Sequence, residues 1–248
     1  MSLWDARYSL LAYWGPRRED PDMLAFRLMR TLKALPAIHP DFAHWFIYPD
    51  RESDLRAAPF DHDELARIIA RGVSRSDDGY PEPEGGYYFS VTNELVATPR
   101  WVTLSFSAGC IYRSRAFHNT AELLTAPLSA ANAPLITVPV MKAVLLALVS
   151  IWDATWCGVA PWDIVLRRPG KRPKPPFFPQ AWIAYLSARF APLVTPPRTI
   201  VSEHVPGGGL LMVATQERFD LDNPAHMAAA LEIEDALLPV SALPWPQD

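Results

Sequence analysis

The sequence has only two cysteines and no excess of basic residues, and each shortage disfavours a class of protein. Cys110 and Cys157 belong to no recognisable metal or redox motif, so we expect two reduced, partly buried thiols, although a disulfide between them stays possible. With 23 Lys and Arg against 27 Asp and Glu, the net charge is −4. Nucleic-acid-binding proteins usually carry a basic surface, so this balance better suits a protein whose partner is basic.

No stretch of the chain is apolar for long enough to span a membrane. The longest apolar run, Val138–Trp152, contains Pro139 and Lys142 and is shorter than the roughly 20 residues of a spanning helix. The N-terminus has neither a basic n-region nor an apolar h-region, so we expect no signal peptide. These absences predict a cytoplasmic protein with no membrane partner.

Motifs of catalysis and metal binding are also missing. The six histidines form no His-Glu-x-x-His or His-x-His pair, and the chain has no Gly-x-Ser-x-Gly turn. We therefore predict no enzyme, no catalytic residues, no metal ligands and no cofactor. One alternative is an uncharacterised hydrolase that uses His118 or His204, which would need one of these imidazoles in a polar cleft.

Two local clusters resemble binding motifs but have simpler structural explanations. Residues 61–64, Asp-His-Asp-Glu, have the residue types of a metal site, but Asp61 and Glu64 have the spacing of a helix N-cap. Three glycines at 207–209 lead into an apolar strand and not into a helix N-terminus. They therefore predict a hairpin turn and not a phosphate-binding loop.

The basic, proline-rich segment 167–179 supports a second alternative function. It holds five Lys or Arg residues and two phenylalanines, and basic residues near aromatic rings can bind single-stranded nucleic acid. Its prolines exclude a helix or an inner strand. A solvated loop is the simpler interpretation, and a nucleic-acid-binding module acting through residues 167–174 is the alternative.

Hydrophobic residues and prolines are plentiful. Half of the 248 residues are hydrophobic, which is enough for a substantial core. No convincing linker divides the chain, so we expect one domain over residues 1–248. The 26 prolines, roughly twice the usual share of about 5%, lie mostly at the ends of expected elements and indicate long ordered loops.

Hydrophobic periodicity predicts the order of strands and helices. Apolar residues on both faces of 7–14 predict an inner strand, and alternation over 100–108 predicts a half-buried antiparallel strand. The mixture predicts an α+β fold, a single domain with a mainly antiparallel mixed sheet and helices packed on it. The expected strands are 7–14, 42–48, 87–93, 100–108, 110–113, 155–160, 199–205 and 210–215, and the expected helices are 21–35, 62–71, 137–152, 181–190 and from 224 onward. Asp20, directly before Pro21, is the expected N-cap of the first helix.

An acidic, turn-rich segment follows the second expected helix and includes one tyrosine. Protein interfaces favour an aromatic anchor with charged neighbours, and complementary charge speeds association. We therefore expect this segment to contact a protein partner, the alternative being an ordinary solvated loop. The predicted contact residues are Asp77, Asp78, Tyr80, Glu82 and Glu84.

The sequence YSLLAYWGPR at 8–17 resembles the opening of the immunity protein 52 family of bacterial polymorphic-toxin systems. Further similarities follow in order over most of the chain. They lie at 40–45, 75–79, 102–109, Asn119, 181–187 and 208–219. The segment 167–179 is a departure, since it has no counterpart in the family's pattern.

The resemblance implies a non-enzymatic protein that is made beside a toxin and neutralises it. The family's usual partner is similar to restriction-endonuclease-like nucleases, often delivered by a type VI secretion system. The resemblance thus implies stoichiometric, non-covalent inhibition of a cognate nuclease effector, with no direct nucleic-acid partner. A nuclease presents a basic cleft to DNA, and acidic groups on a rigid scaffold would complement it. The oligomeric state stays open.

Overall fold

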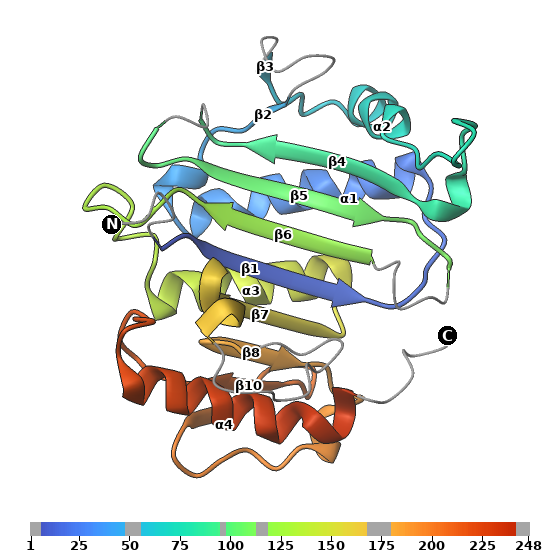
Figure 1. Cartoon of the computed structure of the whole chain (residues 1–248). Helices are drawn as coiled ribbons and strands as arrows, with labels where there is room; N and C mark the ends of the chain where they lie inside the picture. Colours follow the sequence, from blue (N-terminus) through green and yellow to red (C-terminus); the bar gives the residue numbers. More distant parts are fainter. Residues whose placement is uncertain (1–5, 48–55, 95–97, 113–118, 168–179, 242–248) are drawn as a thin grey trace.

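An antiparallel sheet runs through the protein and carries its helices on both faces (Figure 1). The computed structural model describes residues 6–47, 56–94, 98–112, 119–167 and 180–241. Within them the sheet has ten strands in the order β3-β2-β4-β5-β6-β1-β7-β8-β10-β9. The strands are β1 (Tyr8–Trp14), β2 (Phe46–Ile47), β3 (Arg56–Ala57), β4 (Tyr87–Thr92), β5 (Val102–Ala108), β6 (Asn119–Thr125), β7 (Trp156–Pro161), β8 (Ile183–Leu186), β9 (Val201–His204) and β10 (Leu210–Val213).

The first strand of the chain lies in the middle of this sheet. β1 pairs antiparallel with β6 on one side and with β7 on the other, so that Leu11 stands opposite both Glu122 and Gly158. Alternate residues of β1, from Tyr8 to Trp14, are buried against the helices behind the sheet. The prediction of an inner strand at 7–14 is therefore confirmed.

Three of the four described α-helices lie on one side of the sheet and the fourth lies on the other. In Figure 1, α1 and α3 are behind the sheet, and α4 crosses in front of β8 and β10. α2 packs against α1 and β4. The helices are α1 (Pro21–Ala34), α2 (His62–Arg71), α3 (Val138–Trp152) and α4 (Pro224–Ser241).

The predicted helix caps are present. The Asp20 carboxylate accepts a hydrogen bond of 2.9 Å from the Met23 N–H at the start of α1. The Asp61 carboxylate likewise accepts one of 2.8 Å from the Glu64 N–H at the start of α2. Each satisfies a backbone donor that the first helical turn leaves without a partner.

Two hydrophobic clusters form the core, one on each face of the sheet. In the larger, the Trp152 ring packs 4.6 Å from Phe106 and 5.3 Å from Trp14, and its indole N–H donates to the Thr31 hydroxyl at 3.0 Å. The smaller cluster lies between α4 and the strands β7, β8 and β10, with Ile233 and Leu237 fully buried. Both faces of the sheet therefore carry buried side chains.

The predicted helix at 181–190 is wrong. Residues 183–186 form β8, which pairs antiparallel with β7 and β10. Every residue from 181 to 186 is buried. A short run that is apolar on all sides suits a buried strand as well as a buried helix, and here the two neighbouring strands decided the outcome.

Other boundaries also differ from the sequence prediction. β6 was not predicted, because Asn119–Thr125 alternates small and polar residues with only two leucines. In the expected strand 42–48, Phe42 ends a 3-10 turn and only Phe46–Ile47 is extended, while residue 48 lies outside the described residues. The expected strand at 110–113 is absent at 110–112, and residue 113 lies outside the description.

The fold class is nevertheless the predicted one, an α+β arrangement with an antiparallel sheet.

Cys110 and Cys157 are both buried and free, so the two thiols form no disulfide. Burial raises the pKa of each thiol. Among the described helices, none combines the length and the apolar character needed to cross a membrane.

Candidate partner interface

The acidic segment 74–86 folds as a small hairpin between α2 and β4, which we call the acidic hairpin (Figure 1). Arg75 pairs antiparallel with Pro81. At its end the Gly79 N–H donates to the Ser76 carbonyl at 2.8 Å, which closes a four-residue turn. Gly79 has φ of 83°, a backbone conformation that favours glycine.

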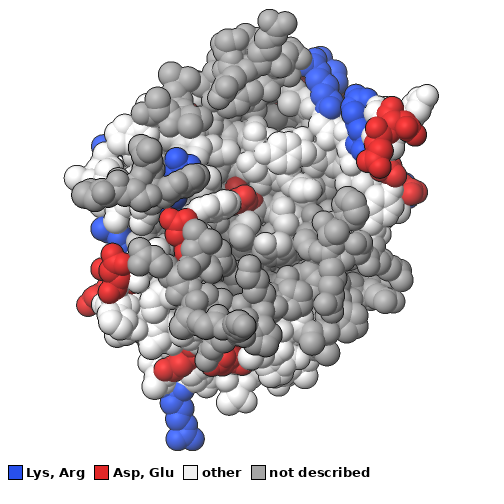
Figure 2. Space-filling view, viewed as in Figure 1, with Lys and Arg blue, Asp and Glu red and all other residues white. Residues whose placement is uncertain are grey.

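The tip of the acidic hairpin presents two carboxylates and an aromatic ring to solvent. Asp77 and Asp78 occupy the two central positions of the turn, and both are exposed. Tyr80 follows the turn and is 72% exposed. In Figure 2, acidic side chains gather at the edge of the molecule where Figure 1 shows this hairpin, with basic side chains beside them.

Glu82 and Glu84 lie at the base of the acidic hairpin and are engaged within the protein. The Tyr112 hydroxyl donates to Glu82 at 2.6 Å, and this hydrogen bond raises the pKa of Tyr112 to about 12. Glu84 forms an ion pair of 3.2 Å with Arg18. The five predicted contact residues therefore divide into an unengaged tip and a base that holds the hairpin, and their contact with a partner stays a prediction.

The base also joins the acidic hairpin to the end of β5. The Ile111 N–H donates to the Glu84 carbonyl at 3.0 Å. Gly86 has φ of 83°, and a Cβ there would lie only 2.6 Å from the Ala108 carbonyl oxygen. These contacts fix the direction of the hairpin, so its tip is held in place before any partner binds.

The metal-like run 61–64 is used for capping and local hydrogen bonds. Asp61 caps α2, and the His62 ring contacts the Asp63 carboxylate at 3.1 Å and the Asp22 carbonyl at 3.0 Å. The hydrogen bond to Asp63 is the main cause that raises the pKa of His62. No group of three potential metal ligands converges among the described residues.

The glycine cluster at 207–209 forms the turn between β9 and β10. The Val205 N–H donates to the Gly209 carbonyl at 2.9 Å, and Gly207 and Gly208 have φ of 91° and 84°. The predicted hairpin turn is therefore confirmed. Its backbone N–H groups do not open a helix, which is the arrangement that binds phosphate.

Neither alternative function gains a site from the described residues. His204 lies exposed on the strand β9 at the edge of the sheet, and His118 lies outside the described residues. In the basic segment 167–174, only the backbone of Arg167 is described, at the end of the 3-10 segment η5 (Trp162–Arg167).

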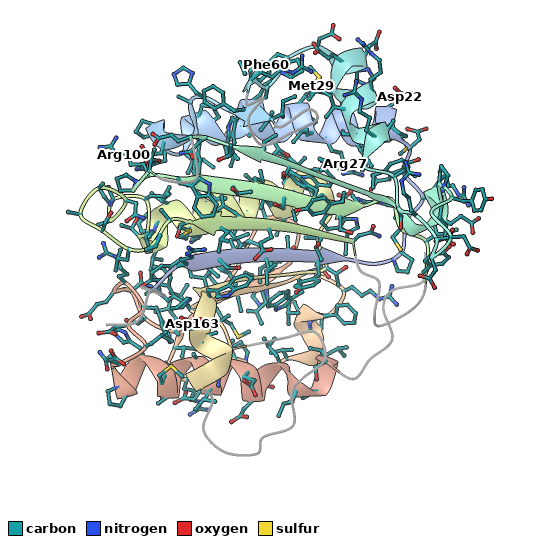
Figure 3. All side chains as sticks on the ribbon, turned by 45° about the horizontal axis from the view of Figure 1, so that its top comes forward. Asp22, Arg27, Met29, Phe60, Arg100 and Asp163 are labelled. Carbon is teal, nitrogen blue, oxygen red and sulfur yellow. The ribbon has the colours of Figure 1, made fainter. Side chains whose placement is uncertain are left out.

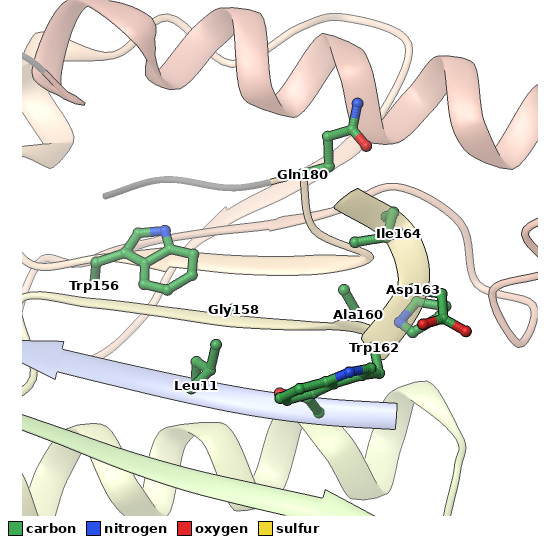
Figure 4. Close-up of a pocket in the computed structure, with 10 residues that line it drawn as sticks. Leu11, Trp156, Gly158, Ala160, Trp162, Asp163, Ile164 and Gln180 are labelled. Carbon is green, nitrogen blue, oxygen red and sulfur yellow. The ribbon is translucent and has the colours of Figure 1, made fainter. Parts of the chain in front are cut away.

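Two hollows in the surface were not predicted from the sequence. One, of about 300 Å³, lies on the same face of the sheet as α4, beside β1 and β7 (Figure 4). The other, of about 490 Å³, lies between α1 and the end of α3. Its lining includes Asp22 and Arg27 of α1, which are labelled in Figure 3. The one available signal for the first was Trp162, a large residue directly after the Pro161 that ends an apolar strand.

Comparison with known proteins matches nearly the whole chain to one family. The model of the family described as immunity protein 52 matches residues 6–243. Among curated proteins, none matches the chain. The fold is similar to the solved structure of a type VI secretion system protein from Pseudomonas aeruginosa, which is 11% identical. That similarity has a TM-score of 0.46 and covers 98% of this chain and 87% of the other.

Proposed function

Because the chain belongs to the immunity protein 52 family, we propose that it binds and neutralises a cognate bacterial toxin. The family match over residues 6–243 is the observation that carries this proposal, since it includes every described strand and helix. The partner is therefore a protein, and the inhibition is stoichiometric and non-covalent. No catalytic step by this chain is needed.

We further propose that the toxin is a nuclease of the restriction-endonuclease-like type, delivered by a type VI secretion system and met in the cytoplasm. The net charge of −4 and the unengaged carboxylates of Asp77 and Asp78 support a basic partner. A fixed acidic tip loses little conformational freedom on binding, and this lowers the cost of association. Tyr80 supplies an amphipathic ring of the kind that interfaces favour.

Co-expression with the protein encoded by the adjacent gene tests the proposal. We expect that protein to be toxic alone and harmless when this chain is present. The purified pair should elute as a complex, and DNA cleavage should stop when the two chains reach a fixed molar ratio. The matched control is an unrelated toxin with its own immunity protein, which this chain should leave unaffected.

Failure to rescue cells from the adjacent gene product would contradict the proposed function. Rescue without inhibition of DNA cleavage would retain the immunity role and remove the nuclease assignment. Inhibition that is incomplete whenever this chain is present in fewer copies than the toxin supports stoichiometric binding. Inactivation of many toxin molecules by one copy of this chain would indicate an enzyme.

A further inference from the structure

The face of the sheet that carries α4 is open over β4, β5 and β6. α4 crosses β8 and β10, and no described helix crosses the other three strands on that side (Figure 1). Among the described side chains that Figure 2 shows over these strands, most are uncharged. We call this surface the open face, and its exposed and half-buried side chains include Tyr88, Ser90, Ser105, Ser107, Thr120 and Glu122.

Glu122 lies in the middle of one row of residues that runs across the open face. It stands opposite Ser105 of β5 on one side and opposite Leu11 of β1 on the other, and Ser105 in turn stands opposite Ser90 of β4. Leu11 packs against the smaller core cluster, which lies beneath α4, so the row is on the α4 side of the sheet. Residues directly opposite each other on antiparallel strands share a face, with Cβ atoms about 4.5–5.5 Å apart.

The Glu122 carboxylate has no cationic partner within the part of the chain that the structure describes. None of the ion pairs there includes it. Its one hydrogen bond there comes from the Ser9 hydroxyl, which donates to Oε1 at 3.4 Å. The Oε2 atom accepts none, yet it is not closed off from solvent, and the side chain as a whole is half-buried. A partner can therefore reach this carboxylate.

The fold gains little from a carboxylate at this position. Burial raises the pKa of Glu122, and the Ser9 hydrogen bond lowers it by less. The charge also acts on its neighbour: burial raises the pKa of Tyr13 to about 12, and Glu122 contributes to that rise. A charged group that lowers stability and anchors no element is typical of binding sites, where function and stability compete.

The surroundings of Glu122 suit a guanidinium group. Ser90 and Ser105 are small, so the row leaves room for a long side chain above the sheet, and their hydroxyls can accept hydrogen bonds. A guanidinium group has five N–H donors and binds a carboxylate through two parallel hydrogen bonds. A lysine ammonium makes no such paired contact, so arginine fits this arrangement better.

We propose that the open face is a contact surface for the toxin and that one arginine of the toxin pairs there with Glu122. The inference rests on the proposed function, because it assigns the arginine to the toxin. It agrees with a basic partner, and it gives the two acidic regions different tasks. Exposed charges such as those of the acidic hairpin mainly set the association rate, whereas a charge pair that the partner covers mainly slows dissociation.

Toxin affinity tests the role of Glu122. We expect Glu122→Gln to weaken toxin binding at least about tenfold, mostly through faster dissociation, because the arginine would be covered without its counter-charge. The matched control is Asp63→Asn, which removes one exposed charge on α2, on the other side of the sheet, and should leave affinity unchanged. An equal loss in both variants would show that only net charge matters and would overturn the proposal.

The stability of the isolated chain separates a binding role from a structural one. Glu122→Gln should raise the midpoint of urea denaturation while it weakens toxin binding, and a purely structural residue would not move the two in opposite directions. A lower midpoint would show that the carboxylate already has a partner within the chain, which would overturn the proposal.

A lysine placed opposite Glu122 gives a second test. Ser105→Lys supplies the counter-charge from within the sheet and occupies the place of the toxin's arginine, so it should weaken toxin binding at least about tenfold. Ser202→Lys adds the same charge on the exposed edge strand β9 and should leave affinity unchanged.

Modification with phenylglyoxal, which reacts with arginine, tests the identity of the toxin residue. In the complex with the wild-type chain we expect one toxin arginine to be protected, as located by mass spectrometry. The same arginine should become reactive in the complex with Glu122→Gln, at a concentration that saturates the toxin. If no arginine differs between the two complexes, the assignment to arginine is wrong.

The outcomes distinguish this inference from the proposed function. If the wild-type chain neutralises the toxin, and both Glu122→Gln and Ser105→Lys retain full affinity, the open face is not the contact surface and the immunity function stands. If the wild-type chain binds no toxin, both fail. If the two variants alter only self-association of this chain, the open face binds a second copy and the assignment to the toxin is overturned.

Discussion

At the scale of single residues, the surroundings of each acidic side chain determine what its charge does. Asp77 and Asp78 lie exposed in a turn, whereas Glu84 pairs with Arg18 and Glu82 accepts the Tyr112 hydroxyl. At the base of the acidic hairpin the charge serves local structure, and we propose that at the tip it serves recognition of the partner. Of these four residues, only Asp77 and Asp78 can have their charges reversed without breaking a contact that holds the acidic hairpin.

Reversing the tip charges should slow association with the toxin. We expect the double variant Asp77→Lys, Asp78→Lys to reduce the association rate about tenfold at low salt, because electrostatic attraction becomes repulsion. Stopped-flow or surface binding kinetics measure this rate, and the thermal midpoint should not change. As a control, Asp222→Lys with Asp235→Lys reverses two exposed charges elsewhere. An equal loss in both double variants would point to net charge and not to the acidic hairpin.

Glu122 is a carboxylate near the centre of the sheet, and burial raises its pKa. Its charged form is therefore less favourable in the folded state than in the unfolded state. The folded state retains the proton to higher pH, so this group lowers stability as pH rises from the usual pKa of 4.5 through the raised value. Above the raised value the carboxyl is charged in both states, and the full loss of stability is present.

Removing that charge should stabilise the protein. We predict that Glu122→Gln raises the free energy of unfolding at pH 7. The gain should shrink as pH falls through the raised pKa toward 4.5 and disappear below 4.5, where the carboxyl is neutral in both states. Urea denaturation at several pH values measures this difference. A gain that is constant with pH would show that the effect does not come from the charge.

At the scale of elements, an ion-pair network built on one buried carboxylate joins the start of α1 to the end of α3. The fully buried Glu19 carboxylate lies 3.0 Å from Arg17 and 2.6 Å from Arg27. Both guanidinium groups also contact Asp153, which follows α3 and has φ of 52°. Because Glu19 lies just before α1, the network fixes where that helix begins relative to α3.

Neutralising Glu19 should loosen this junction. We expect Glu19→Gln to lower the free energy of unfolding by about 2 kcal/mol, since two guanidinium groups lose their buried partner. Urea denaturation measures it. The matched control is Glu84→Gln, which removes an exposed ion pair with Arg18 and should change stability by less than about 0.5 kcal/mol. Equal effects of the two substitutions would mean that burial of Glu19 does not matter.

At the scale of the whole molecule, one sheet holds both core clusters together. β1 links the strands β6 and β5 on one side to β7 and β8 on the other. The larger cluster packs behind this sheet and the smaller packs beneath α4, so neither half has a sheet of its own. We propose that the whole chain is one domain and unfolds as one cooperative unit.

Thermal and urea unfolding should therefore each show a single transition. Far-ultraviolet circular dichroism, which follows the helices, and tryptophan fluorescence should give the same midpoint. Trp14 and Trp152 report the larger cluster and Trp156 reports the smaller, so single-tryptophan variants can compare them. Two separate midpoints would show that the halves fold independently.

The sequence by itself determined the features that depend on near neighbours. The inner strand at 8–14, the Asp20 and Asp61 caps and the glycine turn at 207–209 follow from residue types a few positions apart. These features were predicted because backbone hydrogen bonding and side-chain alternation leave a local pattern. The family resemblance likewise came from the sequence, and the match over residues 6–243 confirmed it.

Only the tertiary structure decided the features that depend on distant partners. β6 is extended because β1 and β5 flank it, and residues 183–186 are a strand because β7 and β10 pair with them. The engagement of Glu82 by Tyr112, and the row that sets Glu122 between Ser105 and Leu11, bring together residues from separate segments. Hydrogen bonds and packing between such segments depend on how the chain is arranged in space, and no local pattern records that arrangement.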